Sequence, residues 1–565
     1  MRISGVLKWA FQALKPAHQP PRFMPTKRLA SCASLRHSPA FAFMPRPRYT
    51  ACMNTRTDSG AHAAADTRAT LDRLAAERIL VLDGAMGTMV QREGLTEADF
   101  RGERFKAHET NLAGCNDLLC LTKPDAISRI HERYLQAGAD IIETCSFNAT
   151  AVSLADYGLA AHAYEISRAA AALAKGAAAR FSTADKPRFV AGVMGPLTKC
   201  ASISPDMDDP GARGIAWDEL EAAYYDNARG LLDGGADMLL IETVFDTLNA
   251  KAAAAAVMRL RDERQTDVPL MLSATTSGAA GRLLAGQTVE AFAASVLHAE
   301  PWSVGLNCSS GASSLQPYVA ALSACVPCRV SAHPNAGLPN ESGEYDETPE
   351  SMAAQVAAYA EAGIVNVVGG CCGSTPAHIV AIAKAVRHIP PRAVPAATGR
   401  TVLAGLEPLE IGAEAGIAVI GERTNVSGSR RFLRLIAEDN YSGALRIARE
   451  SVAQGARLID ICMDDALLDS RETMTRFVNL ALSDPDIARV PFVLDSSRWD
   501  TLEAALKCVQ GKALVNSVSL KEGEAEFLRR ALCARRYGAA VVVMLFDEAG
   551  QAADYARKVE LAPHS

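Results

Sequence analysis

The sequence contains no apolar run long enough to cross a bilayer, which takes about 20 consecutive apolar residues. Aromatic residues are few, at 6%, although 49% of all residues are apolar, as in ordinary globular proteins. The formal net charge of −6 gives no reason to expect a nucleic-acid or membrane partner. The 14 cysteines are irregularly spaced over 565 residues, which excludes a small disulfide framework and favours a reducing, cytoplasmic location.

Acidic residues are missing from the N-terminus. The first 57 residues contain ten Lys or Arg and no Asp or Glu, a composition typical of organelle transit peptides. The scattered prolines do not suit an amphipathic targeting helix, however. We favour the alternative of a disordered or wrongly assigned upstream extension, with Met53 as a candidate start. Residues 1–68 are therefore expected to be a basic extension outside the fold.

Residues 69–385 alternate short apolar runs with alanine-rich stretches of helical length. Eight of the apolar runs are expected strands: Ile79–Leu82, Asp140–Glu143, Phe189–Val193, Met238–Glu242, Leu270–Ala274, Ser303–Leu306, Arg329–Ala332 and Val365–Val368. Eight strands alternating with helices predict an α/β fold, a closed (β/α)8 TIM barrel. An open doubly wound sheet is the rival, but no Gly-x-Gly-x-x-Gly turn follows the first strand.

Three cysteines follow two of these expected strands. Cys308 comes after one apolar run, and the adjacent pair Cys371 and Cys372 comes after another. The carboxyl ends of barrel strands face one mouth, so we expect the three thiols to meet there. Three thiolates would form a tetrahedral zinc site with its fourth position open. Buried apolar cysteines are the alternative.

A second alternation follows residues 386–405, which are proline-rich and predict a linker. Within residues 406–565 five strands are expected: Ile417–Ile420, Leu458–Ile461, Phe492–Leu494, Ala513–Val515 and Ala540–Leu545. Five βα units cannot close an eight-fold barrel. We therefore expect a second, incomplete TIM barrel.

Several motifs in the first alternation resemble the homocysteine S-methyltransferase domain. They are Asp83-Gly-Ala-Met-Gly-Thr, Gly286-Gln-Thr-Val-Glu-Ala-Phe, Gly305-Leu-Asn-Cys, Pro334-Asn-Ala-Gly-Leu-Pro-Asn and Gly369-Gly-Cys-Cys-Gly-Ser. The second alternation resembles the start of a pterin-binding barrel, through Gly421-Glu-Arg-Thr-Asn-Val-Ser-Gly-Ser-Arg, Asp495-Ser-Ser, Val515-Asn-Ser and Phe546-Asp-Glu-Ala-Gly-Gln. In this order the motifs resemble the cobalamin-dependent methionine synthase family.

The resemblance implies that Cys308, Cys371 and Cys372 bind catalytic zinc and that the homocysteine sulfur takes the fourth position. Zinc lowers the pKa of a bound thiol, so homocysteine is held as a nucleophilic thiolate at neutral pH. The family further implies methyl transfer from methylcobalamin to form methionine. It also implies 5-methyltetrahydrofolate as the methyl donor that restores methylcobalamin.

Carboxylates also stand at expected strand ends. Asp83, Glu143 and Glu242 are placed to bind the amino group of homocysteine, with internal ion pairs of the barrel rim as the alternative role. His333 lies near the expected mouth, and we expect a hydrogen-bonded loop histidine there rather than a ligand.

In the second barrel the resemblance places five residues around a folate: Gly428, Ser429, Arg430, Asp495 and Asn516. A carboxylate and an amide suit the donor and acceptor edges of a pterin ring. Cys462 stands where the family leads us to expect asparagine, which puts one pterin hydrogen bond in question.

The sequence contains no Asp-x-His-x-x-Gly signature of a cobalamin-binding module. That module is therefore expected to be missing or to reside on another chain. One alternative is a cobalamin-independent homocysteine S-methyltransferase, although such enzymes resemble only residues 70–385. The other is an inactive zinc- or folate-binding fragment.

Overall fold

The computed structural model describes residues 59–277 and 280–562. The expectation for residues 1–58 lies outside the described residues. Helix α2 (Ser59–Glu77) begins inside the segment expected to precede the fold, because its alanine-rich sequence favours a helix. Residues from Ala64 onward form one compact unit. No helix in the described part of the chain combines the length and apolarity needed to span a membrane.

The first sheet is a nearly closed ring of eight parallel strands, which confirms the expected barrel. The strands are β1 (Leu80–Val81), β2 (Ile141–Glu143), β3 (Phe189–Met194), β4 (Met238–Val244), β5 (Leu270–Ala274), β6 (Ser303–Gly311), β7 (Arg329–Asn335) and β8 (Val367–Val368). Their order is β1-β8-β7-β6-β5-β4-β3-β2. A parallel bridge between Leu82 and Ile141 joins the two ends of this order.

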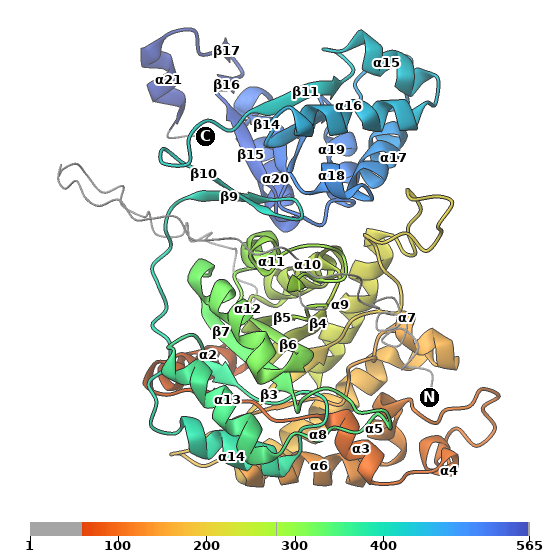
Figure 1. Ribbon diagram of the computed structural model, residues 1–565, viewed down its shortest axis with the longest axis vertical. Helices are drawn as coiled ribbons and strands as arrows, with labels where there is room; N and C mark the ends of the chain where they lie inside the picture. The colour runs from red at the N-terminus through yellow and green to blue at the C-terminus, as the bar shows by residue number, and fades with distance from the viewer. Residues whose placement is uncertain (1–58, 278–279, 563–565) are drawn as a thin grey trace, which may run out of the picture. The chain divides into compact units, whose positions relative to one another are not determined.

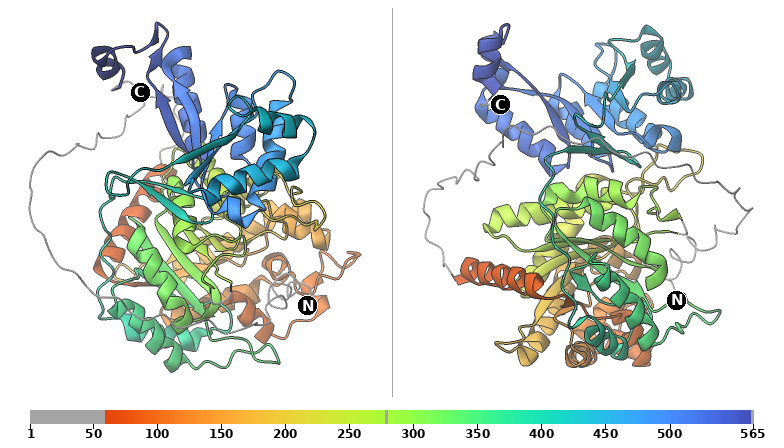
Figure 2. Two further views of the ribbon diagram at one scale, coloured as in Figure 1. Left: turned by 45° about the horizontal axis from the view of Figure 1, so that its top comes forward. Right: turned by 60° about the vertical axis from the view of Figure 1, so that its left-hand side comes forward.

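Helices form an outer layer around these strands (Figures 1 and 2). The longer ones are α6 (Pro124–Ala137), α8 (Ala163–Phe181), α9 (Trp217–Asp233), α10 (Thr247–Arg264), α11 (Val289–Val296), α12 (Ala312–Cys325), α13 (Pro349–Glu361) and α14 (Pro376–Val386). Shorter helices are α3 (Met86–Arg92), α4 (Glu97–Arg101), α5 (Leu119–Thr122) and α7 (Ala151–Leu154).

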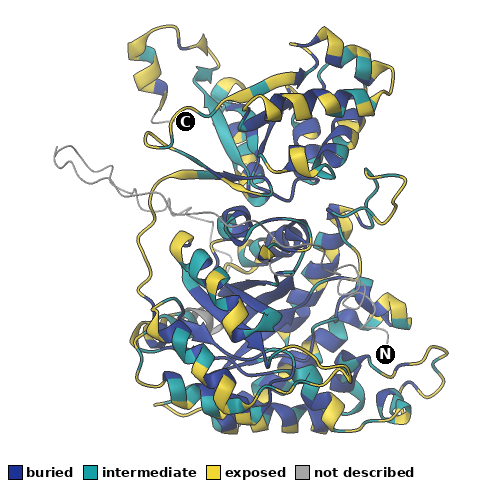
Figure 3. Ribbon diagram, viewed as in Figure 1, coloured by how far each residue is buried: buried dark blue, intermediate teal, exposed yellow. Residues whose placement is uncertain are grey.

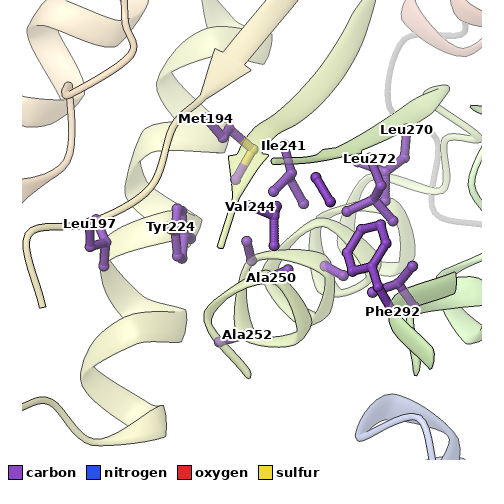
Figure 4. Close-up of a cluster of buried hydrophobic side chains, with 14 of the residues drawn as sticks. Met194, Leu197, Tyr224, Ile241, Val244, Ala250, Ala252, Leu270, Leu272 and Phe292 are labelled. Atoms are coloured by element: carbon purple, nitrogen blue, oxygen red, sulfur yellow. The ribbon is translucent and has the colours of Figure 1, made fainter. Parts of the chain in front are cut away.

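Small side chains bring helix α10 close to the sheet. Its alanine run from Ala252 to Ala256 is fully buried. Figure 4 shows Ile241, Val244 and Leu272 in the buried cluster between the strands and α10. Apolar contact of this kind holds the barrel wall, and with it the strand ends, in place.

A β-hairpin stands at the end of the expected linker. β9 (Thr401–Ala404) pairs antiparallel with β10 (Pro408–Ile411). Gln287 Nε2 donates a hydrogen bond to the Gly405 carbonyl at 2.7 Å, and the Thr288 amide donates to the Leu406 carbonyl at 3.0 Å. The end of the proline-rich segment is therefore ordered against the start of α11.

The second sheet has five parallel strands in the order β11-β12-β13-β14-β15, consistent with a partial barrel. They are β11 (Ile420–Asn425), β12 (Leu458–Cys462), β13 (Phe492–Asp495), β14 (Leu514–Ser519) and β15 (Ala540–Met544). The helices are α15 (Arg430–Ala437), α16 (Tyr441–Ala453), α17 (Ser470–Leu482), α18 (Pro485–Ala488), α19 (Trp499–Leu506) and α20 (Glu524–Arg536). A small pair, β16 (Phe546–Asp547) and β17 (Gly550–Gln551), and helix α21 (Tyr555–Leu561) follow.

The first strand of this sheet begins later than its apolar run predicts. Ile417 is 89% exposed and precedes β11, which starts at Ile420. Apolar sequence alone placed the strand too early, because pairing with β12 starts only where Ile420 meets Leu458. Figure 3 shows the strands of the first sheet as buried and much of β14 and β15 as intermediate.

Candidate functional site

The adjacent cysteines lie in a tight turn between β8 and α14. A Cβ atom on Gly370 would come within 2.4 Å of Ser374 Oγ, so only glycine fits before the pair. The Cys371 amide donates to the Pro334 carbonyl at 2.7 Å, and the Ser374 amide donates to the Cys371 carbonyl at 3.0 Å. Cys371 and Cys372 are thus tied to the end of β7 as well as to their own turn.

The third cysteine is held by an unusual backbone at the end of β6. Cys308 and Ser309 have φ of 59° and 67°, a left-handed conformation that non-glycine residues rarely adopt. Asn307, one residue earlier, anchors the strand: its Oδ1 accepts hydrogen bonds from the Thr243 amide at 3.0 Å and from Ser273 Oγ at 2.7 Å. The strained turn directs Cys308 toward the cysteine pair.

The structure brings the three predicted cysteines together. The Sγ atoms of Cys308, Cys371 and Cys372 all lie within 4.8 Å of one another, with 3.5 Å between Cys308 and Cys372. A tetrahedral zinc ion with Zn–S bonds of about 2.3 Å separates its sulfur ligands by about 3.8 Å. All three cysteines are free and partly accessible. The cluster therefore suits zinc with one position left open.

The thiols affect one another's ionisation. Hydrogen bonds from Cys308 and Cys371 lower the pKa of Cys372, whereas the hydrogen bond between Cys308 and Cys371 raises the pKa of Cys371. One sulfur can be a thiolate while its neighbours donate to it, but three thiolates so close repel each other. A divalent cation removes that repulsion, which is a second reason why this cluster suits a metal.

Three buried carboxyl groups lie at the same mouth. Asp83 is 1% exposed, and its oxygens accept the Glu143 amide at 3.2 and 3.1 Å. Burial raises the pKa of Asp83 and of Glu143, and it raises the pKa of Glu242 to about 8. Among the described residues, no Lys or Arg pairs with any of the three. The alternative role as rim ion pairs is therefore not observed in this part of the chain.

His333 differs from the expectation of a hydrogen-bonded loop residue. It lies within β7, it is 1% exposed, and its Nε2 has no hydrogen-bond partner among the described residues. Its Nδ1 is 4.0 Å from Glu143 Oε1, and one ligand atom each of His333, Glu143 and Glu242 lie within 4.8 Å of one another. Burial lowers its pKa to about 3, so the imidazole is neutral. The placement of His333 in a loop was wrong because β7 extends three residues beyond the expected strand end.

Two residues that sequence reasoning missed lie beside the cysteines. Asn307 Nδ2 donates to Cys371 Sγ at 3.8 Å, and the Tyr345 ring packs against Gly373, the residue after Cys372, where a Cβ atom would lie 2.3 Å from its Cγ. Asn307 carried a signal, because it directly precedes Cys308 in the same strand. Tyr345 carried none, since it lies in a loop far from both cysteine motifs in sequence.

In the second sheet, an amide–carboxylate network joins the ends of neighbouring strands. Asn425 Nδ2 donates to Asp460 Oδ2 at 2.9 Å and to Asp495 Oδ2 at 3.2 Å. Asn516 Nδ2 donates to Asp495 Oδ1 at 3.2 Å. Burial, followed by the charge of Asp460, raises the pKa of Asp495 to about 6. Cys462 is opposite Asp495 in the ladder between β12 and β13.

The remaining predicted folate residues lie in the turn from β11 to α15. The Gly428 amide donates to the Asn425 carbonyl at 3.2 Å, which connects the turn to the network. Ser429 Oγ caps α15 by accepting the Phe432 amide at 3.3 Å. Arg430 is exposed at the first position of the helix.

Fold and site together define a nearly closed barrel whose three-cysteine cluster suits a metal, followed by a parallel α/β sheet with a polar network at its strand ends. The chain belongs to the homocysteine S-methyltransferase family, whose profile matches residues 80–386, more than half of the chain. A profile described as "Pterin binding enzyme" matches residues 421–564. This order of domains is the N-terminal arrangement of cobalamin-dependent methionine synthase.

The solved structures that match parts of this chain are distant from it in sequence. The Escherichia coli homocysteine methyltransferase MmuM is 23% identical in its oxidised form and 24% in its metallated form, with TM-scores of 0.44 and 0.42. Each match covers 56% of this chain and 98% of the other. The carboxyl transferase domain of Rhizobium etli pyruvate carboxylase is 14% identical with a TM-score of 0.30, over 61% of this chain and 53% of the other. At these values the likeness carries no functional argument.

Proposed function

We propose that this chain methylates the sulfur of homocysteine to give methionine, with zinc held by Cys308, Cys371 and Cys372. The observation that carries the proposal is the convergence of three sulfur atoms from two strand ends within 4.8 Å. When bound there, zinc supplies Lewis acidity that keeps a fourth, substrate sulfur deprotonated at neutral pH. All three cysteines are partly accessible, so a substrate sulfur can reach the fourth position.

The buried carboxyl groups are proposed to bind the ammonium group of homocysteine. Asp83, Glu143 and Glu242 have no cationic partner among the described residues, and burial raises the pKa of each. A substrate ammonium group brings the missing positive charge, which lowers those pKa values and lets a carboxylate form. Glu143 Oε1, which has no hydrogen-bond partner among the described residues, is free to accept from it.

The methyl donor is proposed to be 5-methyltetrahydrofolate, bound at the strand ends of the second sheet. Asp495 and Asn516 present the carboxylate and the amide that a pterin edge requires, and Gly428, Ser429 and Arg430 border them. Because the thiol site and the folate site belong to different sheets, a mobile carrier has to visit both. We infer that methylcobalamin is this carrier, on a module outside the residues given.

Zinc content and methionine formation test the proposal. The parent chain is compared with Cys371→Ala/Cys372→Ala and with the control Cys325→Ala/Cys328→Ala, a pair outside the cluster at the end of α12. Parent and control should each hold about one zinc per chain and form methionine from homocysteine and free methylcobalamin. The Cys371→Ala/Cys372→Ala variant should lose both.

Other results would overturn parts of the proposal. Zinc retained by the Cys371→Ala/Cys372→Ala variant, or absent from the carefully reduced parent, contradicts the metal site. Methionine formed only from a sulfonium donor contradicts the cobalamin route and indicates a cobalamin-independent enzyme. Zinc binding without transfer from either donor indicates an inactive binding fragment.

A further inference from the structure

His333 lies buried at the barrel mouth, next to a carboxyl group to which it is not hydrogen-bonded. The residue is 1% exposed, and its Nδ1 stands 4.0 Å from Glu143 Oε1, which is too far for a hydrogen bond. Neither His333 Nε2 nor Glu143 Oε1 has a hydrogen-bond partner in the described part of the chain. Because buried polar atoms without partners cost free energy, we expect a ligand to bond to this pair.

Strand pairing turns the His333 ring toward the barrel interior. In the ladder between β6 and β7, His333 pairs with Asn307, whose side chain reaches inward to accept the Thr243 amide of β4 at 3.0 Å. Paired residues of neighbouring strands project to the same face of a sheet, so His333 points inward as well. Pro334 follows it, and the Pro334 carbonyl accepts the Cys371 amide at 2.7 Å. The backbone of His333 is therefore fixed directly beside the cysteine segments.

Three hydrogen-bond acceptors from three strands converge at this point. One ligand atom each of His333, Glu143 and Glu242 lie within 4.8 Å of one another. Carboxylate oxygens only accept hydrogen bonds, and an imidazole that burial keeps neutral, by lowering its pKa, has one acceptor nitrogen. Both oxygens of Asp83 already accept the Glu143 amide, at 3.2 and 3.1 Å, so Asp83 braces the end of β2. The three converging acceptors match a primary ammonium group, which has three N–H donors.

The 4.0 Å separation of His333 Nδ1 and Glu143 Oε1 suits an ammonium group better than a metal ion. An ammonium nitrogen that lies about 2.9 Å from both atoms sees them about 90° apart, an angle that two of its hydrogens span with nearly straight bonds. A metal ion that lies about 2.1 Å from both atoms would need an angle of about 145°, which neither tetrahedral nor octahedral coordination offers. The distance therefore favours a nitrogen donor between the two residues.

We propose that His333 is a specificity-determining residue, whose ring nitrogen accepts one hydrogen bond from the ammonium group of the substrate while Glu143 and Glu242 accept the other two. The inference rests on the proposed function, because it requires a thiol substrate that carries a primary amino group. A thiol without that group leaves three buried acceptors without a donor, so the site selects amino thiols.

Two ligands that differ only in the amino group test this role. Homocysteine and γ-mercaptobutyrate are titrated calorimetrically into the zinc-loaded full chain, into His333→Leu and into the control His388→Leu, at an exposed position. His333→Leu should raise the dissociation constant of homocysteine on the order of tenfold and change that of γ-mercaptobutyrate by less than about twofold. His388→Leu should change neither. His333→Asn, which places an acceptor oxygen where Nδ1 stands, should restore most of the affinity for homocysteine.

Several outcomes would overturn the role of His333 and leave the proposed function standing. They are equal weakening of both ligands in His333→Leu, unchanged affinity for both, or a second zinc ion in the parent that this variant loses. If His333→Leu does not fold, histidine-selective nitrogen NMR of the parent gives the answer. The Nδ1 resonance of His333 should move with homocysteine but not with γ-mercaptobutyrate, and equal movement with both would contradict the inference. A parent that binds neither thiol would overturn the proposed function, and this inference with it.

Discussion

The two sheets of this chain have similar strand sequences but bury them differently. Every residue of β3, β4 and β5 is buried, whereas all five residues of β15, Ala540–Met544, are only half-buried. In the ring each strand has two neighbours, while β11 and β15 stand at the edges of the second sheet with one neighbour each. Closure of the sheet, rather than apolar sequence, decides how much of a strand leaves water.

The carboxyl groups at the strand ends of the two sheets also differ in how deeply they are buried. Asp83 in the ring is 1% exposed, and the three carboxyl groups there have raised pKa values mainly through burial. Asp495 in the open sheet is half-buried, and its pKa rises to about 6, from burial and then from neighbouring carboxylates. The closed ring thus favours neutral carboxyl groups at its mouth, whereas the open sheet holds a less buried carboxyl group whose pKa is about 6.

Alanine substitutions at two glycines with positive φ, one in each half of the fold, should give the largest difference in the free energy of unfolding. Gly373→Ala adds a Cβ atom 2.3 Å from the Tyr345 ring at φ of 80°, so strain and overlap should lower the free energy of unfolding by about 3 kcal/mol. Gly455→Ala, between α16 and β12, has φ of 102° but nothing within 4 Å, so only strain of about 1 kcal/mol is expected. Urea unfolding measures both, and equal losses would contradict the overlap.

A matched pair of valine-to-alanine substitutions, one in each sheet, tests how closure of the sheet affects the loss of stability. Val193→Ala in β3 removes a side chain that is 1% exposed and should cost about 2–3 kcal/mol. Val542→Ala in half-buried β15 should cost about 1 kcal/mol. Urea unfolding combined with amide hydrogen exchange assigns each loss to its sheet. A larger loss at Val542 would show that the second sheet is the better-packed one.

Protonation of the buried His131 imidazole should lower the stability of the first barrel at acidic pH. Burial on α6 lowers its pKa to about 4, and neither ring nitrogen has a partner among the described residues. Stability is then complete above pH about 6.5 and falls as pH drops toward 4, by about 2 kcal/mol between pH 7 and 5.

The His131→Met variant should lose this part of the acid dependence in urea titrations at pH 5 and 7. His388→Met, at an exposed position, is the control. An identical acid slope in parent and His131→Met proteins would show that the imidazole is not buried in its neutral form.

In the second sheet, Asp495 should lower stability as the pH rises, which is opposite in sign to the effect of His131. This is the smallest of the expected effects. The pKa of Asp495 is raised to about 6 in the fold, so its contribution to stability is complete below pH about 4 and is lost as pH rises through 6. Because the group is half exposed, the loss is about 1 kcal/mol. Asp495→Asn should be more stable than the parent at pH 7.5 but not at pH 4.5. A gain that does not depend on pH, or an equal gain in the control Asp486→Asn, would contradict this account.

Sequence reasoning located the barrel and the cysteine cluster but missed several neighbours. The alternation of apolar runs predicted all eight strands, and the Gly-Gly-Cys-Cys turn predicted where two thiols lie, because both signals are local. The hairpin β9–β10 was missed, since the preceding prolines indicate a linker and only contact with α11 orders it. His333 was misplaced because ladder pairing carries β7 onward to Asn335.

By itself, the sequence determined the number and order of strands, the residues at their carboxyl ends and the family to which the chain belongs, because periodicity and motif spacing are written along the chain. Only the tertiary structure decided which of those residues touch. The sulfur of Cys308 lies 3.5 Å from that of Cys372 although two helices and two strands separate them in sequence, and Tyr345 packs against Gly373 from a hairpin with no motif of its own. Such contacts depend on how closure of the ring and packing of its loops bring distant segments together, and no local pattern encodes that distance.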